Sequence, residues 1–493
     1  MHEGRKFRES KDHARCRAAL AALIGAAMLA LAPAVHAAGS PERSAGSADG
    51  AQPAAPLERL APPGPPAYAG DGLIYDQDYP FIGYSNPPQL NDVAHLIERM
   101  KSGKVRLQFT EPRGYLDSLL KALHIDPDSQ VLVFSKTSLQ TSLIGPETPR
   151  AIYFNDDTYV AWIADTPMIE ITTMDSMMGT VFYIMLEQRS HAPHFERETT
   201  QCLQCHDTFS ESGGGVPNFL FLSAYTREHH EIVTNQVAEH TSDATPLTDR
   251  WGGWYVTGDL GGIEHLGNIL PPASGELQDS ALHARNYATL DSLFDTQPYL
   301  TDKSDVVALL ILQHQVDIHN LIIHANYKCR MLMERHKRGS STEPIDWDRL
   351  PPLMQKRFKV LLDPLIEGML MVNATKFPAP IHGNSGYAKS FEARGPFDRQ
   401  GRSLRDLDLK TRLFKYPLSF LIYSQGFDYL PISAKQYVYR RLDRILTSRE
   451  ESPTFANLST DDRRNIFEIL RATKPDFARA VAHDSGMTAE AGR

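Results

Sequence analysis

The stretch that most constrains this chain of 493 residues is the run from Asp302 to His336, which favours one long helix. Apolar residues fall on most sides of that helix: Val306, Val307, Leu309, Leu310, Leu312, Val316, Ile318, Leu321 and Ile322. A helix of this character is usually buried between other layers of a protein. We therefore expect other elements to surround it, including later helices at residues 352–372, 434–446 and 460–473.

The residues before this helical half show a different pattern. Short runs rich in β-branched and aromatic residues favour strands at residues 131–134, 151–154, 159–163, 169–171 and 181–184. Turns are expected at residues 155–157 and 178–179, and short helices at residues 93–100 and 115–123. Consecutive strands joined by such turns favour an antiparallel meander. The predicted fold class is α+β, with a strand-rich N-terminal lobe and a helical C-terminal lobe.

The N-terminus has the three parts of a secretory signal peptide. Basic residues come first: Arg5, Lys6, Arg8, Lys11, Arg15 and Arg17. An apolar run from Ala18 to Ala32 follows, and Val35-His36-Ala37 matches a small-residue cleavage site. The run is shorter than the roughly 20 apolar residues that a transmembrane helix needs. We predict a cleaved signal peptide at residues 1–37 and a periplasmic or secreted protein.

The mature chain is acidic. Residues 1–37 hold six basic and three acidic residues, so the net charge of −9 becomes −12 without them. This charge gives little reason to bind nucleic acid, whereas a cationic redox partner protein is compatible with it. Residues 38–72 are rich in Ala, Pro, Gly and Ser and are expected to form a disordered linker. No transmembrane segment is expected in the mature chain, and its oligomeric state cannot be predicted.

The strongest motif in the chain is Cys202-Leu203-Gln204-Cys205-His206. Two cysteines three positions apart, with a histidine directly after the second, form the attachment pattern for c-type haem. One turn of backbone separates the thiols by about the distance between the two porphyrin vinyl groups. The histidine that follows can then bind iron as the proximal axial ligand. The motif therefore predicts one covalently attached haem c on Cys202 and Cys205, with His206 on the iron.

Three other interpretations of the motif were weighed. A structural zinc site needs further ligands at recognisable spacing, and none follows. A thioredoxin-like redox pair needs a helix start after a strand in a βαβ unit, whereas polar residues 196–200 precede this motif. A plain disulfide leaves His206 unexplained. If haem takes two cysteines, Cys329 is the one cysteine left in the mature chain, so the fold must depend on a hydrophobic core.

Through these five residues the chain resembles the c-type cytochromes. The phrase from Arg250 to Gly258 resembles those of large bacterial secreted proteins that carry one haem motif, and this resemblance implies no particular substrate. The expected organisation is a strand-rich lobe at 73–190, a haem-binding segment at 191–275, a helical lobe at 276–475 and a tail at 476–493.

The sixth iron ligand is the next question. No methionine occurs between His206 and Met331, a gap of 125 residues, so a nearby methionine ligand is not expected. Eight histidines fill that gap: His229, His230, His240, His265, His283, His314, His319 and His324. His265 is preferred because it follows the Trp251–Gly258 stretch, whose tryptophans could wall a porphyrin pocket. His240 comes next. His314, His319 and His324 are spaced by five residues and point to different sides of one helix.

These observations favour a mono-haem c-type cytochrome that acts in electron transfer. Two alternatives stay open: a haem oxidoreductase or peroxidase-like enzyme with an open distal site, and a haem-based sensor or scaffold. Arg250 and Tyr255 could contact haem propionates, although a packing role is equally compatible with them. No catalytic residue can be singled out, and the sequence leaves open whether the protein is an enzyme.

Overall fold

The computed structural model describes residues 79–482, apart from residues 80, 89, 191–192, 209–214, 225–238, 271–285 and 337–344. The predicted signal peptide at residues 1–37 and the predicted linker at 38–72 lie outside the described residues. Most of the predicted tail, from residue 483 onward, lies outside them as well.

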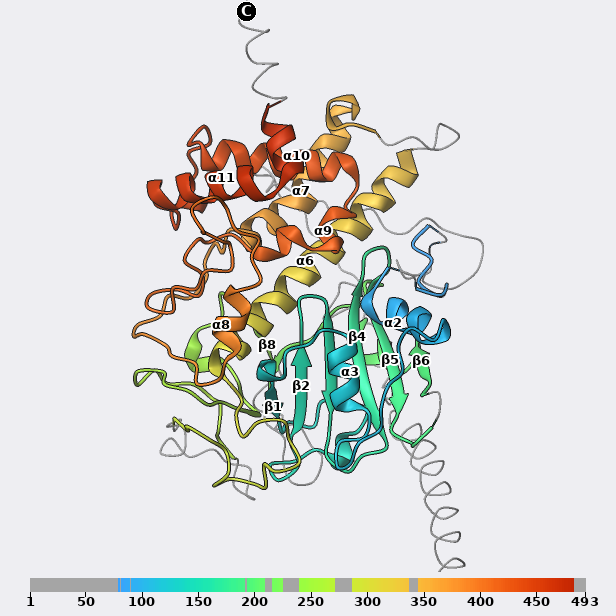
Figure 1. Ribbon diagram of the computed structural model, residues 1–493. Helices are drawn as coiled ribbons and strands as arrows, with labels where there is room; N and C mark the ends of the chain where they lie inside the picture. Colours follow the sequence, from blue (N-terminus) through green and yellow to red (C-terminus); the bar gives the residue numbers. More distant parts are fainter. Residues whose placement is uncertain are drawn as a thin grey trace, which may run out of the picture. The chain divides into compact units, whose positions relative to one another are not determined.

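Seven strands form one antiparallel sheet in the order β6-β5-β4-β3-β2-β1-β9 (Figure 1). They are β1 (Val131–Val133), β2 (Arg150–Phe154), β3 (Thr158–Trp162), β4 (Met168–Asp175), β5 (Gly179–Leu186), β6 (Phe195–Glu198) and β9 (Trp254–Tyr255). The first six follow one another across the sheet, which confirms the expected meander. β9 comes from much later in the chain and pairs with β1. Sequence reasoning missed β6 and β9 because β6 holds one apolar residue among charged ones and β9 has two residues in all, so neither gives a strand signal.

The strand register sorts side chains onto two faces of the sheet, because successive residues of a strand point in opposite directions. Face A carries these paired residues of β3, β4 and β5: Tyr159, Thr172 and Phe182. Face B carries their neighbours: Val160, Ile171 and Tyr183. Helices α2 (Asp92–Lys101) and α3 (Leu116–Ala122) belong to face B, where Asn91 at the start of α2 donates to the Asp175 carboxylate at 2.8 Å. Face A packs against residues that follow β6 and against α6, whose Gln315 donates to the Tyr159 hydroxyl at 2.8 Å.

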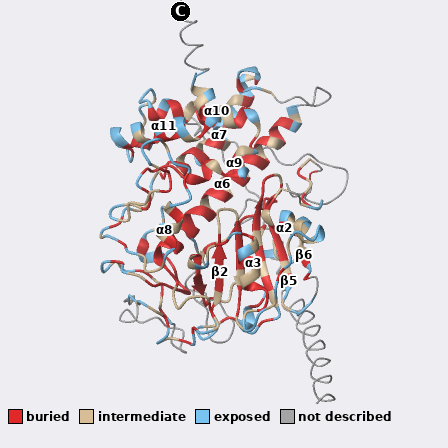
Figure 2. Cartoon of the chain, in the orientation of Figure 1, coloured by how far each residue is buried: buried red, intermediate tan, exposed pale blue. Residues whose placement is uncertain are grey.

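The long helix α6 spans Val306–His336 and lies deep in the protein, as Figure 2 shows. It starts later than the predicted Asp302 because the Asp305 carboxylate accepts the amide hydrogens of Val307 at 2.7 Å and Ala308 at 3.3 Å. An aspartate in this position ends the preceding loop and satisfies amides that have no partner inside the helix. Its other carboxylate oxygen accepts two more amide hydrogens, from residues 384 and 385.

The remaining described helices of the C-terminal half lie directly on α6 in some cases and on its neighbours in the others. They are α7 (Pro352–Met369), α8 (Tyr387–Glu392), α9 (Gln425–Asp428), α10 (Ile432–Leu446) and α11 (Thr460–Thr473). The sequence predicted α7, α10 and α11, and a capping box between Ser459 and Asp462 starts α11. The connection at 383–405 contains α8, whose buried Tyr387 and Phe391 pack into the core. The α+β fold class is confirmed.

Among the described helices, α6 alone is long and apolar enough to cross a membrane. However, 83% of its most apolar window is buried inside the protein. The same length and apolar character are expected of a helix at the centre of a hydrophobic core. One hydrophobic core extends from the sheet through α6 to α11.

We predict that Asp305→Ala lowers the free energy of unfolding by at least about 2 kcal/mol, because four amide hydrogens lose a buried acceptor. Asp302→Ala is the control, since Asp302 makes a partly exposed ion pair with Lys303 and should cost less than about 0.5 kcal/mol. Chemical denaturation followed by circular dichroism measures both. Equal losses in the two variants would contradict the capping role.

Candidate functional site

The Cys202–His206 motif forms a single helical turn directly after β6. The Glu198 carboxylate at the end of β6 accepts the amide hydrogens of Thr200 at 2.6 Å and Gln201 at 2.9 Å, which turns the chain. Helix α4 (Leu203–His206) follows, with the His206 amide donating to the Cys202 carbonyl at 3.0 Å. The one turn of backbone that the motif requires is therefore present.

The His206 imidazole is held by a backbone carbonyl. Its Nδ1 lies 2.8 Å from the carbonyl oxygen of Asn218, and the Asn218 amide donates back to the His206 carbonyl at 2.9 Å. A carbonyl can only accept, so Nδ1 carries the proton and Nε2 keeps its lone pair. Burial lowers the pKa of His206 to about 4, which keeps the ring neutral near pH 7. A neutral ring with a free Nε2 is the form that binds a metal.

Ring contacts hold His206, Phe219 and Phe221 against face A. Three pairs make these contacts, at centroid distances of 4.6, 5.0 and 4.5 Å: His206–Phe182, Phe219–Tyr159 and Phe221–Trp254. Asn320 of α6 also bonds both backbone groups of Phe219, at 2.8 and 2.9 Å. The motif is thus supported by both the sheet and the central helix.

The two motif thiols are free and differ in exposure. Cys202 is partly buried, whereas Cys205 is exposed. Burial, together with the negative charges of Glu198 and Glu170, raises the pKa of the Cys202 thiol to about 12. Thioredoxin-like cysteines need a lowered pKa, because the thiolate is their reactive form. The surroundings of Cys202 therefore disfavour the redox-pair interpretation.

A buried ion pair on face A lies beside the motif. Arg150 Nη1 is 3.3 Å from Glu170 Oε2, with the two side chains 13% and 16% exposed. Arg150 Nε is buried and has no hydrogen-bond partner among the described residues. The positive charge of Arg150 contributes to the lowered pKa of His206, after the larger effect of burial. A buried donor without a partner can bind an anionic group at this place.

The predicted distal ligand His265 is buried in a tight loop. Its Nδ1 accepts the amide hydrogen of Gly267 at 3.0 Å, and its ring meets Trp251 edge-on at 5.4 Å. Its Nε2 is buried and has no hydrogen-bond partner among the described residues. Because Nδ1 accepts, the proton of the neutral ring lies on Nε2. His265 as an iron ligand stays a prediction, and it would require the loss of the Gly267 hydrogen bond.

His240 lies in a short ribbon that follows the His206 segment. β7 (Leu222–Ser223) and β8 (Glu239–His240) pair with Leu222 opposite His240, and the His240 side chain is exposed. Burial is the main cause of the lowered His206 pKa, but a charge on His240 contributes to it. The two imidazoles therefore lie close enough for a charge on one to affect the pKa of the other.

The other aromatic and basic residues singled out from the sequence have partners of their own. Trp254 stacks on Phe221 and donates its indole hydrogen to the Leu222 carbonyl at 2.8 Å. Arg250 donates to two backbone carbonyls, and the Tyr255 hydroxyl donates to another. These contacts agree with a packing role for Arg250 and Tyr255.

The remaining candidates lie in α6 or in the core. His314 and His319 are buried and bond different partners, so they do not form one cluster. Cys329 is a buried free thiol. His229, His230 and His283 lie outside the described residues.

Among the described residues, no three His, Cys, Asp or Glu side chains gather in a way that could hold a metal ion. Haem iron differs from such ions because the porphyrin supplies four of its ligands, so one or two protein ligands suffice. The residues present fit that group: two free thiols one turn apart, an imidazole with Nε2 available, and the unpartnered Arg150 Nε.

No known family model, curated protein or solved structure matches the chain.

Sequence reasoning missed Asn218 and the Arg150–Glu170 pair. Asn218 acts through its backbone carbonyl, which no side-chain pattern reveals. Arg150 and Glu170 are brought together by strands β2 and β4, which are separated by β3 in the sheet. The charged residues within otherwise apolar strands were the one signal that could have indicated this pair.

In the chain made without haem attachment, we predict that iodoacetamide at pH 8 modifies Cys205 at least about tenfold faster than Cys202. Cys205 is exposed, whereas the Cys202 pKa of about 12 leaves little thiolate. Peptide mass spectrometry measures the rates, with the denatured chain as the control in which all cysteines react alike. Equal rates in the folded chain would contradict this description of the site.

Proposed function

We propose that the protein is an exported mono-haem c-type cytochrome that acts in electron transfer. Cys202 and Cys205 would carry the haem through two thioether bonds, and His206 Nε2 would bind the iron. The single observation that supports this most is the hydrogen bond from His206 Nδ1 to the Asn218 carbonyl. It leaves Nε2 with a lone pair, and a carbonyl bonded to the other ring nitrogen is typical of metal-binding histidines.

The haem would supply one-electron chemistry, and the chain's own residues would hold it. The Asn218 carbonyl orients the His206 ring, which packs at 4.6 Å against Phe182. Glu170 holds Arg150, whose buried Nε can donate to an anionic group such as a propionate. These contacts restrict the rotation of the proximal ring and offset negative charge on the cofactor.

The exposure of the motif supports electron transfer. Cys205 is exposed, so the edge of the cofactor attached to it would lie near the protein surface. A redox partner must bring its own centre close to such an edge for electrons to pass. The acidic mature chain suits a cationic partner. Export through the predicted signal peptide is part of this proposal because covalent haem attachment of this kind takes place outside the bacterial cytoplasm.

The attachment is tested on protein produced in a host that can attach haem. We expect the haem to remain with the chain after acid–acetone extraction, and the reduced pyridine adduct to show the two-thioether band. Cys202→Ala and Cys205→Ala should shift that band or lose the haem, whereas the control Cys329→Ala should keep both properties. His206→Ala should weaken haem incorporation. Extractable haem in the wild-type protein would refute the proposal.

The sixth iron position separates electron transfer from the enzyme alternative. If His265 binds the iron, as the sequence predicts, it must give up the Gly267 hydrogen bond, and we expect His265→Ala to change the ferric spin state; if His240 binds instead, His240→Ala should change it. Resonance Raman and visible spectra measure both variants. A spin change in His265→Ala alone would identify His265 as the ligand. A high-spin wild type that neither variant changes would favour the haem enzyme with an open distal site.

A further inference from the structure

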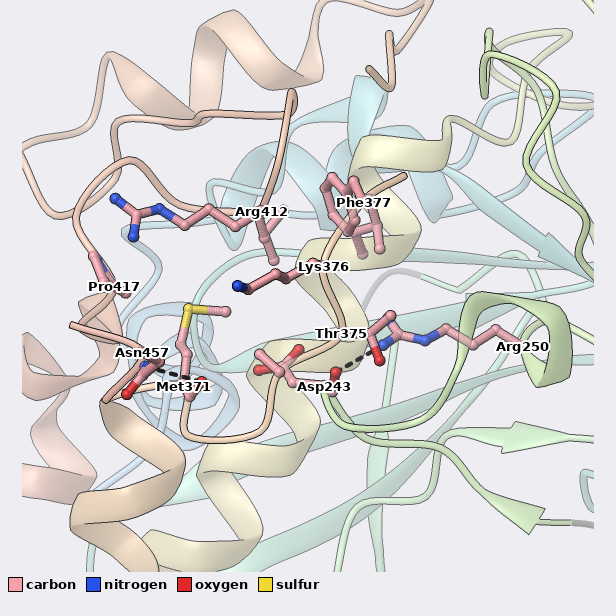
Figure 3. Close-up of a pocket in the computed structure, with 12 residues that line it drawn as sticks. Asp243, Arg250, Met371, Thr375, Lys376, Phe377, Arg412, Pro417 and Asn457 are labelled. Atoms are coloured by element: carbon pink, nitrogen blue, oxygen red, sulfur yellow. Dashed lines mark hydrogen bonds between the residues drawn. The ribbon is translucent and has the colours of Figure 1, made fainter. Parts of the chain in front are cut away.

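A second site lies in the helical half, away from the cysteine motif in the sequence. Figure 3 shows a pocket between the segment at 243–250, helix α6 and the loops at 371–377 and 412–417. The empty space at the pocket amounts to about 530 Å³ when the part open to solvent is included. Its apolar lining consists chiefly of Leu310, Met371, Phe377, Leu413 and Pro417.

Hydrogen bonds fix the walls of this pocket. The Thr375 amide donates to the Asp243 carbonyl at 2.8 Å, and the Thr375 hydroxyl donates to the Thr245 carbonyl at 3.0 Å. The Arg250 guanidinium donates to the same two carbonyls, each at 2.8 Å. Asn457 holds the opposite loop by donating to the Leu370 carbonyl at 2.9 Å. The pocket is therefore formed before any ligand enters.

Two opposite charges point toward the middle of the pocket: the Lys376 ammonium and the Asp243 carboxylate (Figure 3). No ion pair joins them, and Lys376 has no hydrogen-bond or ion-pair partner within the described part of the chain. Asp243 uses only Oδ2, which lies 2.5 Å from His314 Nδ1. Burial opposes ionisation of Asp243, but the charge and hydrogen bond of His314 together with the charge of Arg250 outweigh it and lower the pKa of the carboxyl group.

The other cations of the pocket already have partners. Arg412 donates to both carboxylate oxygens of Asp462, at 2.6 and 3.1 Å, and to the Lys415 carbonyl. Arg250 is committed to the backbone carbonyls of the wall. One unpaired cation and one carboxylate oxygen, Asp243 Oδ1, are thus left to face a ligand across an apolar space.

We propose that this pocket binds a small amino acid with an apolar side chain, in its zwitterionic form. The ligand carboxylate pairs with Lys376, and its ammonium group donates to Asp243 Oδ1. The apolar side chain packs against Met371 and Phe377. Ligand groups of both signs satisfy two pocket charges that form no ion pair with each other.

A hydrolase interpretation of the same region is less well supported. Ser419 Oγ lies 2.9 Å from His314 Nε2, which completes a Ser–His–Asp chain with Asp243. However, Ser419 is fully buried and does not line the pocket. Its hydroxyl also accepts the Leu421 amide hydrogen at the start of the 3₁₀ helix η7 (Phe420–Tyr423). A nucleophile must be reached by substrate, and the buried Ser419 cannot be. The hydrogen bonds from Ser419 through His314 therefore serve to orient the Asp243 carboxylate.

Isothermal titration calorimetry on the full haem-loaded protein tests the proposal with three probes of similar shape. L-leucine carries both charged groups, 4-methylpentanoate lacks the ammonium group, and 3-methylbutylamine lacks the carboxylate. We expect L-leucine to bind at least about tenfold more tightly than either single-charge probe. No binding of L-leucine, or equal binding of L-leucine and 4-methylpentanoate, overturns the proposal.

Two variants assign the charges. Lys376→Met keeps the aliphatic stem and should reduce L-leucine affinity to that of 3-methylbutylamine, whose own binding stays unchanged. Asp243→Asn should reduce L-leucine affinity but leave 4-methylpentanoate unaffected. Lys410→Met is the matched control, because Lys410 is exposed near the pocket but does not line it. Lys376 is an exposed side chain, so its variant is expected to fold. Wild-type L-leucine affinity in Lys376→Met also overturns the proposal.

Discussion

The structure depends on the polar side chains that α6 carries through the middle of the core. A buried polar group costs free energy unless it finds a hydrogen-bond partner. The partners here come from distant segments: Gln313–Ser242, His314–Asp243 and Ser419, Gln315–Asn155, His319–Asp156, Asn320–Phe219 and Tyr327–Met178. Each bond ties one segment to the same helix. α6 therefore fixes the β2–β3 and β4–β5 turns of the sheet, the residues around Phe219 and the helical half relative to one another.

The geometry of the candidate haem site depends on this arrangement around α6. Asn320 fixes the backbone of Phe219, and the neighbouring Asn218 carbonyl then holds the His206 ring. Face A of the sheet supplies the aromatic surface beneath it and the buried Arg150–Glu170 pair. A four-residue helix such as α4 has little stability of its own, so tertiary contacts must hold it in place.

The two proposed sites are joined by one short stretch of chain. His240 ends the ribbon beside the cysteine motif, and Asp243, three residues later, lines the second pocket. Gln313 of α6 donates to the Ser242 carbonyl between them. The stretch from His240 to Asp243 is thus anchored to α6 through Ser242.

Local pattern alone determined the α+β class, the meander, the buried character of α6 and the cysteine motif. Strand alternation, helical periodicity and a five-residue spacing are properties of neighbouring residues, so they can be read without a fold. The tertiary structure decided what depends on distant residues: the pairing of β9 with β1, the Asn218 carbonyl at His206, and the Gly267 hydrogen bond that places the proton of His265 on Nε2. Arg150 and Glu170 lie twenty residues apart, and only the sheet brings their charges together. The chemical form of each histidine follows from such contacts, because its proton position is set by the partner across the ring.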